Sequence, residues 1–337
     1  MNRNDTLFLR FLAIILVINS HMDAFYPNPI FGSGGAIGDA LFFMLSSYGL
    51  LLSEQSKPQT FSNYLAKRIL RIYPVVWSTI LFIILPLIAF YYFQLDLHYH
   101  SFIEDFGLNN SLRVFSLFFF PPSPFWFLEA LMFFYVIGFF FLKNYSNQKL
   151  LAGIAVLSLL YAVFYTQFND YSSLVIEQTV SFKVIFYGMV FLSGIYLGSI
   201  HERIRYTGIF DYLLLFFSVA VIYTHKYLMM HGIAANLQFI QQLFLFPTIY
   251  FFLKISKSPL VLEIIMKPRL VNNIVTLIGA MTLELYLVHG PLRLIAYNYF
   301  PLFPVNVIGF FLMVFTLSYL LYRINNEVIN RIKRLPL

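Results

Sequence analysis

The chain has 337 residues, of which 60% are hydrophobic, 20% aromatic and only 11% charged, and it contains no cysteine. A soluble domain carries about 25% charged residues, so this composition excludes an ordinary water-soluble globular fold. The missing cysteines exclude disulfides, thiolate metal sites and a cysteine nucleophile. The sequence therefore predicts an all-α polytopic membrane protein.

Apolar runs bounded by polar residues predict about ten transmembrane helices in a single bundle. They lie near residues 6–23, 36–53, 72–93, 125–142, 150–166, 184–200, 209–225, 237–253, 274–290 and 305–322. We expect the first run to be a retained span, because no small-residue cleavage site of a signal peptide follows it. Before the fourth run, the proline-rich residues 116–125 predict a broken or re-entrant approach. No repeat and no loop long enough for a second fold is apparent, so residues 1–337 form one predicted membrane domain.

The basic residues predict the orientation of these spans. Most of the 22 Lys and Arg side chains fall in connections on one side, and the other side receives only Arg113, Lys183, Lys226 and Arg293. Cytoplasmic loops carry the excess of positive charge, so both termini are predicted to be cytoplasmic. The net charge of +7 is scattered over separate loops, which argues against nucleic-acid binding.

The first predicted span carries two ionisable residues, Arg10 and His21. At about 100° and 1.5 Å per residue, their separation places them on one helix face, about 16 Å apart along the axis. Ionisable groups at membrane depth usually face a protein interior or a watery cavity. The spacing predicts a polar path along this face.

Arg68 and Arg71 stand just before the third span and are neighbours on a helical face. Two interpretations remain open from the residues alone. Both side chains are suited to anchoring on lipid phosphates at the cytoplasmic surface. They are also suited to binding a phosphorylated cytoplasmic ligand through bidentate contacts.

Two other polar groups receive ordinary structural interpretations. His98 and His100 alternate in the predicted outer segment 94–113, but they lack a third ligand, so we expect a solvated loop and no metal site. Asp39, at the start of the second span, is interpreted as a helix-end residue favoured by the helix dipole.

The amino-terminal pattern resembles that of acyltransferase family 3, a family of bacterial membrane O-acyltransferases. The resemblance rests on an Arg and a His with ten residues between them, a glycine-rich turn, an aromatic second span and an Arg-x-x-Arg motif. The matching positions are Arg10, His21, Gly35, Gly38, Phe42, Phe43, Ser46, Arg68 and Arg71. Further along, FWFLEALMFFY at 125–135 resembles the Trp-centred fourth span, and LELYLVHGP at 283–291 resembles a late Tyr-Leu-x-His segment, so the resemblance covers most of the chain.

Two positions depart from the family pattern. Ser47 stands where many relatives have glycine, and we expect this change to affect packing more than chemistry. Leu131 stands where many relatives have a glutamate, five residues after the fourth-span tryptophan. Glu129 lies only three residues after Trp126, so the family role does not transfer to it, although a carboxylate within an apolar span is itself a site candidate.

The resemblance implies transfer of an acyl group, most often acetyl from acetyl-CoA, to a sugar hydroxyl of a cell-surface or lipid-linked glycan. The implied partners are acyl-CoA, the acceptor glycan and membrane lipids, in the inner membrane of a bacterium. Acyl-CoA is then a substrate, and no tightly bound cofactor and no metal is expected. Arg68 and Arg71 are expected to hold the phosphates of the donor, and Arg10 to guide its entry.

His21 is the predicted general base, because a neutral imidazole with a reference pKa of about 6.5 can accept the proton of an attacking hydroxyl. His289, near the outer end of the ninth span, is predicted to orient the acceptor or to support His21, and Glu129 is a further catalytic candidate. A serine nucleophile is the alternative within enzymes: Ser20 adjoins His21, but no Gly-x-Ser-x-Gly pattern occurs.

A transporter of glycans or lipid-linked sugars is the alternative outside enzymes. Charged residues within the spans would then line a translocation path. The absence of an internal repeat and of matching broken segments in two halves argues against it.

Overall fold

The computed structural model describes residues 3–93, 125–143, 145–168, 180–299 and 302–334. Every regular element in these residues is a helix, and no strand occurs among them, as the predicted all-α class requires. The proline-rich approach at 116–124 and the pair His98 and His100 lie outside the described residues.

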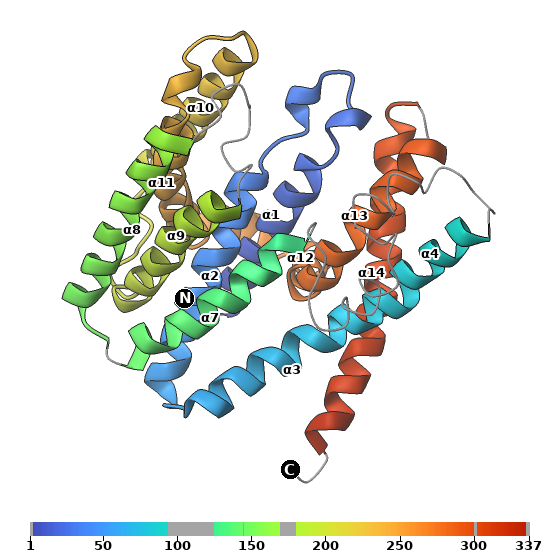
Figure 1. Ribbon diagram of the computed structural model, residues 1–337, viewed down its shortest axis with the longest axis horizontal. Coiled ribbons are helices and arrows are strands. Elements are labelled where there is room, and N and C mark those ends of the chain that lie inside the picture. Colours follow the sequence, from blue (N-terminus) through green and yellow to red (C-terminus); the bar gives the residue numbers. More distant parts are fainter. Residues whose placement is uncertain (1–2, 94–124, 144, 169–179, 300–301, 335–337) are drawn as a thin grey trace. The chain divides into compact units, whose positions relative to one another are not determined.

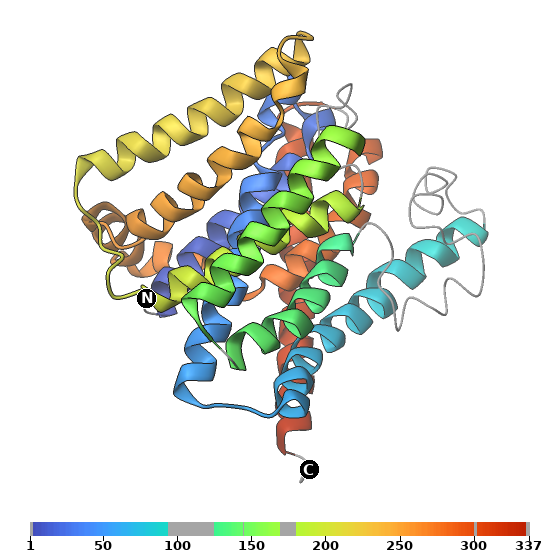
Figure 2. The ribbon, with the colours of Figure 1, turned by 60° about the vertical axis from the view of Figure 1, so that its left-hand side comes forward.

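The helices follow one another along the chain as drawn in Figures 1 and 2. They are α1 (Arg3–Ser20), α2 (Gly35–Ser56), α3 (Phe61–Thr79), α4 (Leu85–Tyr92), α7 (Trp126–Lys143), α8 (Asn147–Phe168), α9 (Val180–Ser199), α10 (Ile209–Met230), α11 (Phe239–Ile255), α12 (Arg269–Ala280), α13 (Thr282–Tyr299) and α14 (Val305–Arg334). A π-helical turn, Ile80–Ile84, joins α3 to α4. Each predicted span coincides with a helical region.

Several of these helices are long and apolar enough to cross a bilayer, so the protein is a multi-pass membrane protein. Within the described part of the chain, 6 helical stretches meet this condition, or up to 7 if α12 and α13 together form one broken span. The total of ten spans and the orientation of the termini stay predictions.

The ninth predicted span, 274–290, is wrong as a continuous helix, because α12 ends at Ala280 and α13 begins at Thr282. No proline marks this break. Gly279, in the last turn of α12, lies directly against the backbone of Leu7, where a side chain would collide. Glycine permits this close approach but weakens the helix that contains it.

The described part of the chain forms two compact units. The first unit comprises Met1–Ala13, Ala36–Gln59 and Phe133–Ala280, and the second comprises Ile14–Gly35, Thr60–Met132 and Met281–Leu337. The helix α1 contributes to both, since its first part belongs to the first unit and its last turns belong to the second.

In the first unit, α2 packs against α7 and α9 through aromatic and small residues. The ring of Phe43 lies 5.2 Å from that of Phe134 and 4.9 Å from that of Tyr187, between ring centroids. Gly194 of α9 faces Ser47 so closely that no side chain would fit between the two helices. Ser47 is fully buried at this contact, which agrees with the packing role expected for this departure from the family pattern.

The first unit also contains two pairs of neighbouring helices, α8 with α9 and α10 with α11 (Figure 1). A buried ion pair between Asp211 of α10 and Lys254 of α11 joins the second pair. Thr207, just before α10, donates its backbone N–H to the same carboxylate at 2.7 Å. Polar groups thus tie these two helices together at one end.

The second unit is built on α3, α13 and α14, which pack pairwise against one another. The turn after α1 is held by Asn19, whose amide nitrogen donates to the carbonyls of Phe31 at 2.7 Å and Ser33 at 2.9 Å. Asn306, in the first turn of α14, donates to the carbonyl of Phe25 at 3.0 Å. These contacts set the position of the residues that directly follow α1.

Candidate active site

His21 is the first residue after α1, which ends at Ser20 and so stops short of the predicted boundary at residue 23. The helix ends because the Asn19 side chain bonds to the returning loop, while the chain enters a 3₁₀ turn at Asp23–Phe25. The His21 backbone N–H still donates to the Ile18 carbonyl at 3.1 Å. His21 is therefore fixed by its backbone, while its side chain is exposed.

His289 of α13 lies beside His21, although the two residues are far apart in the sequence. Their ring centroids are 5.0 Å apart, with the ring planes inclined by 43°. His289 is only 5% exposed, so one imidazole of the pair is buried and the other reaches the surface. The structure thus brings together the two histidines that the sequence had suggested separately.

The hydrogen bond of His289 defines the roles of its two nitrogens. Nδ1 lies 3.2 Å from the carbonyl oxygen of Leu285, one turn earlier on the same helix. A carbonyl oxygen only accepts, so Nδ1 carries the proton. In the neutral ring Nε2 then bears the lone pair, which makes it an acceptor for a neighbouring donor.

Aromatic rings cover the other side of His289. The Tyr286 ring lies 5.7 Å from it, between ring centroids. Phe127 and Phe125, at the start of α7, lie 5.3 Å and 6.2 Å from the Tyr286 ring. These three rings are themselves buried, so the surroundings of His289 on this part of α13 are largely apolar.

Glu129 of α7, the further catalytic candidate, is exposed. Among the residues that the structure describes, none makes a hydrogen bond or ion pair with its carboxylate. Its catalytic role stays a prediction. Arg10 is half-buried in the part of α1 that belongs to the first unit, and its predicted role in guiding the donor is likewise untested.

Arg68 is held by its own helix. Its Nη1 donates to the Tyr64 carbonyl at 2.9 Å, and the guanidinium carbon lies 4.1 Å from the centre of the Tyr64 ring. Tyr64 is buried, so the arginine rests on a rigid support. A guanidinium has five N–H donors. The contacts with Tyr64 hold Arg68 in place through one of them and leave the remaining N–H groups oriented for a ligand.

Arg71 lies near a buried polar pair that the sequence analysis missed. Glu284 of α13 and Asn325 of α14 are 4% and 2% exposed, and the Asn325 amide donates to the Glu284 carboxylate at 3.3 Å. The Arg71 charge acts on this carboxylate. Two features of the sequence could have indicated this pair: a carboxylate within the apolar segment 283–291 and an asparagine in the last predicted helical region. Arg71 therefore lies within electrostatic range of a buried carboxyl group.

The helix α13 connects the two clusters. Glu284 stands in its first turn and His289 five residues later, which is about 7.5 Å along the axis at a rise of 1.5 Å per residue. One rigid helix of the second unit thus carries the carboxylate beside Arg71 and the imidazole beside His21.

A family model described as an acyltransferase domain matches residues 8–323, nearly the whole chain. No match is found among curated proteins or among solved structures. Because the matched region includes both clusters and nearly all of the membrane helices, the chain belongs to acyltransferase family 3 and is an acyltransferase.

Proposed function

We propose that the protein transfers an acyl group, in the first instance acetyl, from cytoplasmic acyl-CoA to a sugar hydroxyl of a cell-surface or lipid-linked glycan. It would do so as one membrane domain in the inner membrane of a bacterium. Family membership supports acyl transfer, and the observation that carries the mechanism is the contact between His21 and His289.

The topology we propose has ten spans with both termini in the cytoplasm. On this topology α3 begins at the cytoplasmic side, α14 ends there, and α13 begins within the ninth span and continues toward the outer face. Arg71 and Asn325 would then lie toward the cytoplasm and His21 toward the outer face, with Glu284 nearer the cytoplasm than His289. The positions of Glu284 and His289 along α13 support this order, because the carboxylate precedes the imidazole on that helix.

The chemical step is a direct transfer. The acceptor oxygen attacks the thioester carbonyl carbon, a C–O bond forms and the C–S bond breaks. His21 accepts the hydroxyl proton during the attack and afterwards returns it to the departing thiolate of CoA. His289 supports His21 through Nε2 and helps to orient the acceptor. No metal or resident cofactor takes part in this step.

Three arginines would bind the donor. Arg68 and Arg71 would contact phosphates of acyl-CoA at the cytoplasmic side, and Arg10 would guide the acyl arm toward His21. Support on Tyr64 keeps Arg68 oriented before the ligand arrives. Preorganised donors lose less freedom on binding, which favours affinity.

The test compares His21→Ala and His21→Gln in the purified protein, with acetyl-CoA saturating and an envelope glycan fraction from a deletion strain as acceptor. Acylated glycan, measured by mass spectrometry, should fall by about two to four powers of ten in both variants. Glutamine forms hydrogen bonds but accepts no proton at neutral pH, so it should not rescue activity.

The matched control is His231→Gln, since His231 is an exposed histidine at the end of α10 in the first unit. It should retain full activity. Near wild-type turnover of His21→Gln would remove the general base from the mechanism. Movement of the glycan across vesicle membranes without donor-dependent acylation would favour a transporter instead.

A further inference from the structure

A polar pocket in the first unit is separate from the residues proposed for chemistry. Its volume is about 480 Å³, and it lies where the end of α2, the connection between α7 and α8 and the residues after α9 come together. Its lining includes Gln55, Tyr145, Asn147, His201 and Arg203. Pockets for small organic ligands typically occupy about 300–1,000 Å³, so this one is large enough for a nucleotide.

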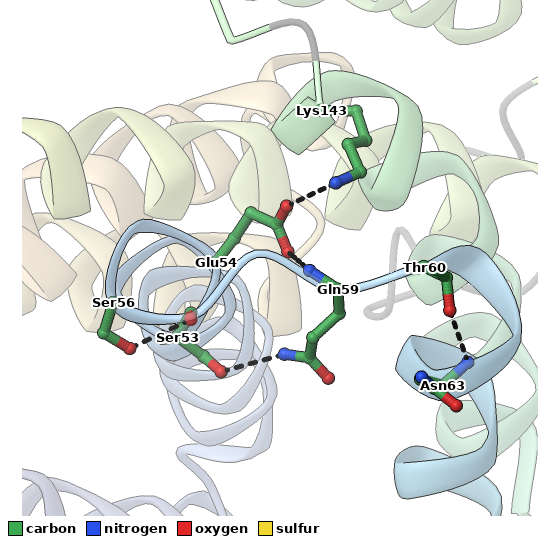
Figure 3. A network of polar contacts seen from close by, with 7 residues as sticks. All are labelled: Ser53, Glu54, Ser56, Gln59, Thr60, Asn63 and Lys143. Atoms are coloured by element: carbon green, nitrogen blue, oxygen red, sulfur yellow. Dashed lines mark hydrogen bonds and ion pairs between the residues drawn. The ribbon is translucent and has the colours of Figure 1, made fainter.

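A network of hydrogen bonds and an ion pair lies beside the pocket, at the end of α2. The Glu54 carboxylate accepts from Lys143, the last residue of α7, at 3.0 Å, and from the backbone N–H of Gln59 at 3.2 Å (Figure 3). The Gln59 side chain in turn donates to the Ser53 hydroxyl at 3.4 Å. On the opposite side, Gly198 lets α9 pack closely on Leu51 of α2. The ends of the three helices α2, α7 and α9 are therefore fixed relative to one another.

The lining side chains offer an aromatic ring and amides. The Tyr145 hydroxyl donates to the Asn147 side-chain oxygen at 2.5 Å, which fixes the orientation of that amide and directs its two N–H donors elsewhere. Gln55 adds an exposed amide with both donor and acceptor groups. A ring for stacking beside amides for hydrogen bonding suits a purine base.

The residues after α9 supply the charged and acceptor groups. The His201 Nδ1 lies 2.9 Å from the Gly198 carbonyl, so this nitrogen is the donor and Nε2 of the neutral ring is an acceptor. The exposed guanidinium of Arg203 provides the cation that a phosphate requires. Glu202, the one carboxylate in the lining, suits a hydroxyl donor such as a ribose hydroxyl.

The predicted topology places this pocket in the cytoplasm. The end of α2, the end of α7, the start of α8 and the end of α9 are all predicted to lie on the cytoplasmic side. Basic residues gather in the same connections: Lys57, Lys143, Lys149, Arg203 and Arg205. Such a field attracts anionic ligands from the cytoplasm.

We propose that this pocket binds the nucleotide half of the acyl-CoA donor, a phosphorylated adenosine. The base would stack on Tyr145 and bond to the amides, and a phosphate would bind Arg203. This proposal rests on the proposed function for the identity of the donor. It assigns recognition of the nucleotide to residues of the first unit.

The probe is adenosine 3′,5′-bisphosphate, which lacks the pantetheine arm and the thioester. Its binding to the full-length protein in lipid nanodiscs is measured by isothermal titration calorimetry. Saturable binding is expected, with the dissociation constant raised about tenfold or more by Arg203→Gln, because a charge-assisted hydrogen bond is lost. Loss of base stacking in Tyr145→Leu should raise it by at least about fivefold.

Arg269→Gln is the matched control, because it removes the same charge from an exposed arginine at the start of α12, outside the pocket lining and outside the connections around it. It should change the dissociation constant by less than about twofold, since salt screens an exposed charge that does not touch the ligand. Both arginines are exposed, so neither change threatens folding. Inorganic phosphate should compete only weakly, because it lacks the base.

Three results would overturn the proposal: no saturable binding by the wild-type protein, equal losses in Arg203→Gln and Arg269→Gln, or unchanged binding in Tyr145→Leu. An acylation assay on the same preparation separates this failure from failure of the proposed function. Wild-type acylation with an unchanged donor KM in Arg203→Gln overturns the pocket alone. Nucleotide binding that follows the expected variant pattern supports the pocket, even if no acyl-CoA yields acylated glycan and the proposed function fails.

Discussion

Replacement of Lys254 by methionine should destabilise the first unit severely. Lys254 and Asp211 are 8% and 1% exposed, so the substitution leaves a buried carboxylate without its cation. Lys254 Nζ also donates to the Thr207 hydroxyl at 3.0 Å, and this bond is lost as well. From the residues that the structure describes, Asp211 keeps the bonds donated by the backbone N–H and the hydroxyl of Thr207, at 2.7 Å and 3.0 Å.

The magnitude follows from the burial of the pair. Breaking a buried ion pair by removing one partner costs about 3–5 kcal/mol, because the remaining charge is desolvated and uncompensated. Two neutral hydrogen bonds from Thr207 do not replace the lost charge. The double variant Asp211→Asn with Lys254→Met should recover most of the loss and come within about 1–2 kcal/mol of the wild type, since neutral groups of similar volume replace the whole pair.

The assay is reversible unfolding in mixed detergent micelles, with the free energy of unfolding measured for each single variant, the double variant and the wild type. Lys267→Met is the matched control. Lys267 also pairs with a carboxylate, that of Glu263, but the two side chains are 72% and 60% exposed, so no measurable change is expected. A loss below about 1 kcal/mol in Lys254→Met, or a double variant as unstable as the single one, would refute the reasoning.

Three further predictions follow from named contacts. Arg71→Lys should preserve insertion but raise the KM for acetyl-CoA by about tenfold, because the planar fork is lost; an unchanged donor titration would favour a lipid anchor. Glu284→Gln should lower turnover about tenfold or more, as measured by acylated glycan, because an amide replaces the buried carboxyl group near Arg71. Glu327→Gln, which changes an exposed carboxylate of α14, should leave turnover unchanged, and equal effects of both changes would argue against a special role of Glu284. Gly194→Ala should cost about 1–3 kcal/mol of unfolding free energy, since its methyl group would meet α2, whereas Gly49→Ala, which meets nothing within 4 Å, should not destabilise.

The sequence by itself determined the class of the protein and most of its local structure. Every predicted span coincides with a helical region, because a segment in lipid must satisfy its backbone hydrogen bonds internally and must be apolar along its length. Both conditions are local and can be recognised in one segment at a time. The family was likewise recognisable from short motifs around His21 and Arg68, and the match over residues 8–323 confirmed it.

Side-chain partners depended on the tertiary structure. His21 and His289 were each suggested by the sequence, but their contact arises from the loop held by Asn19 and from the packing of α13 in the second unit. The pairing of Glu284 with Asn325, the break after Ala280 and the pocket near Tyr145 had no decisive signal in the chain. Which side chains meet depends on how closely helices approach one another. That approach depends on small residues such as Gly194 and Gly279, whose partners lie on helices distant in the sequence.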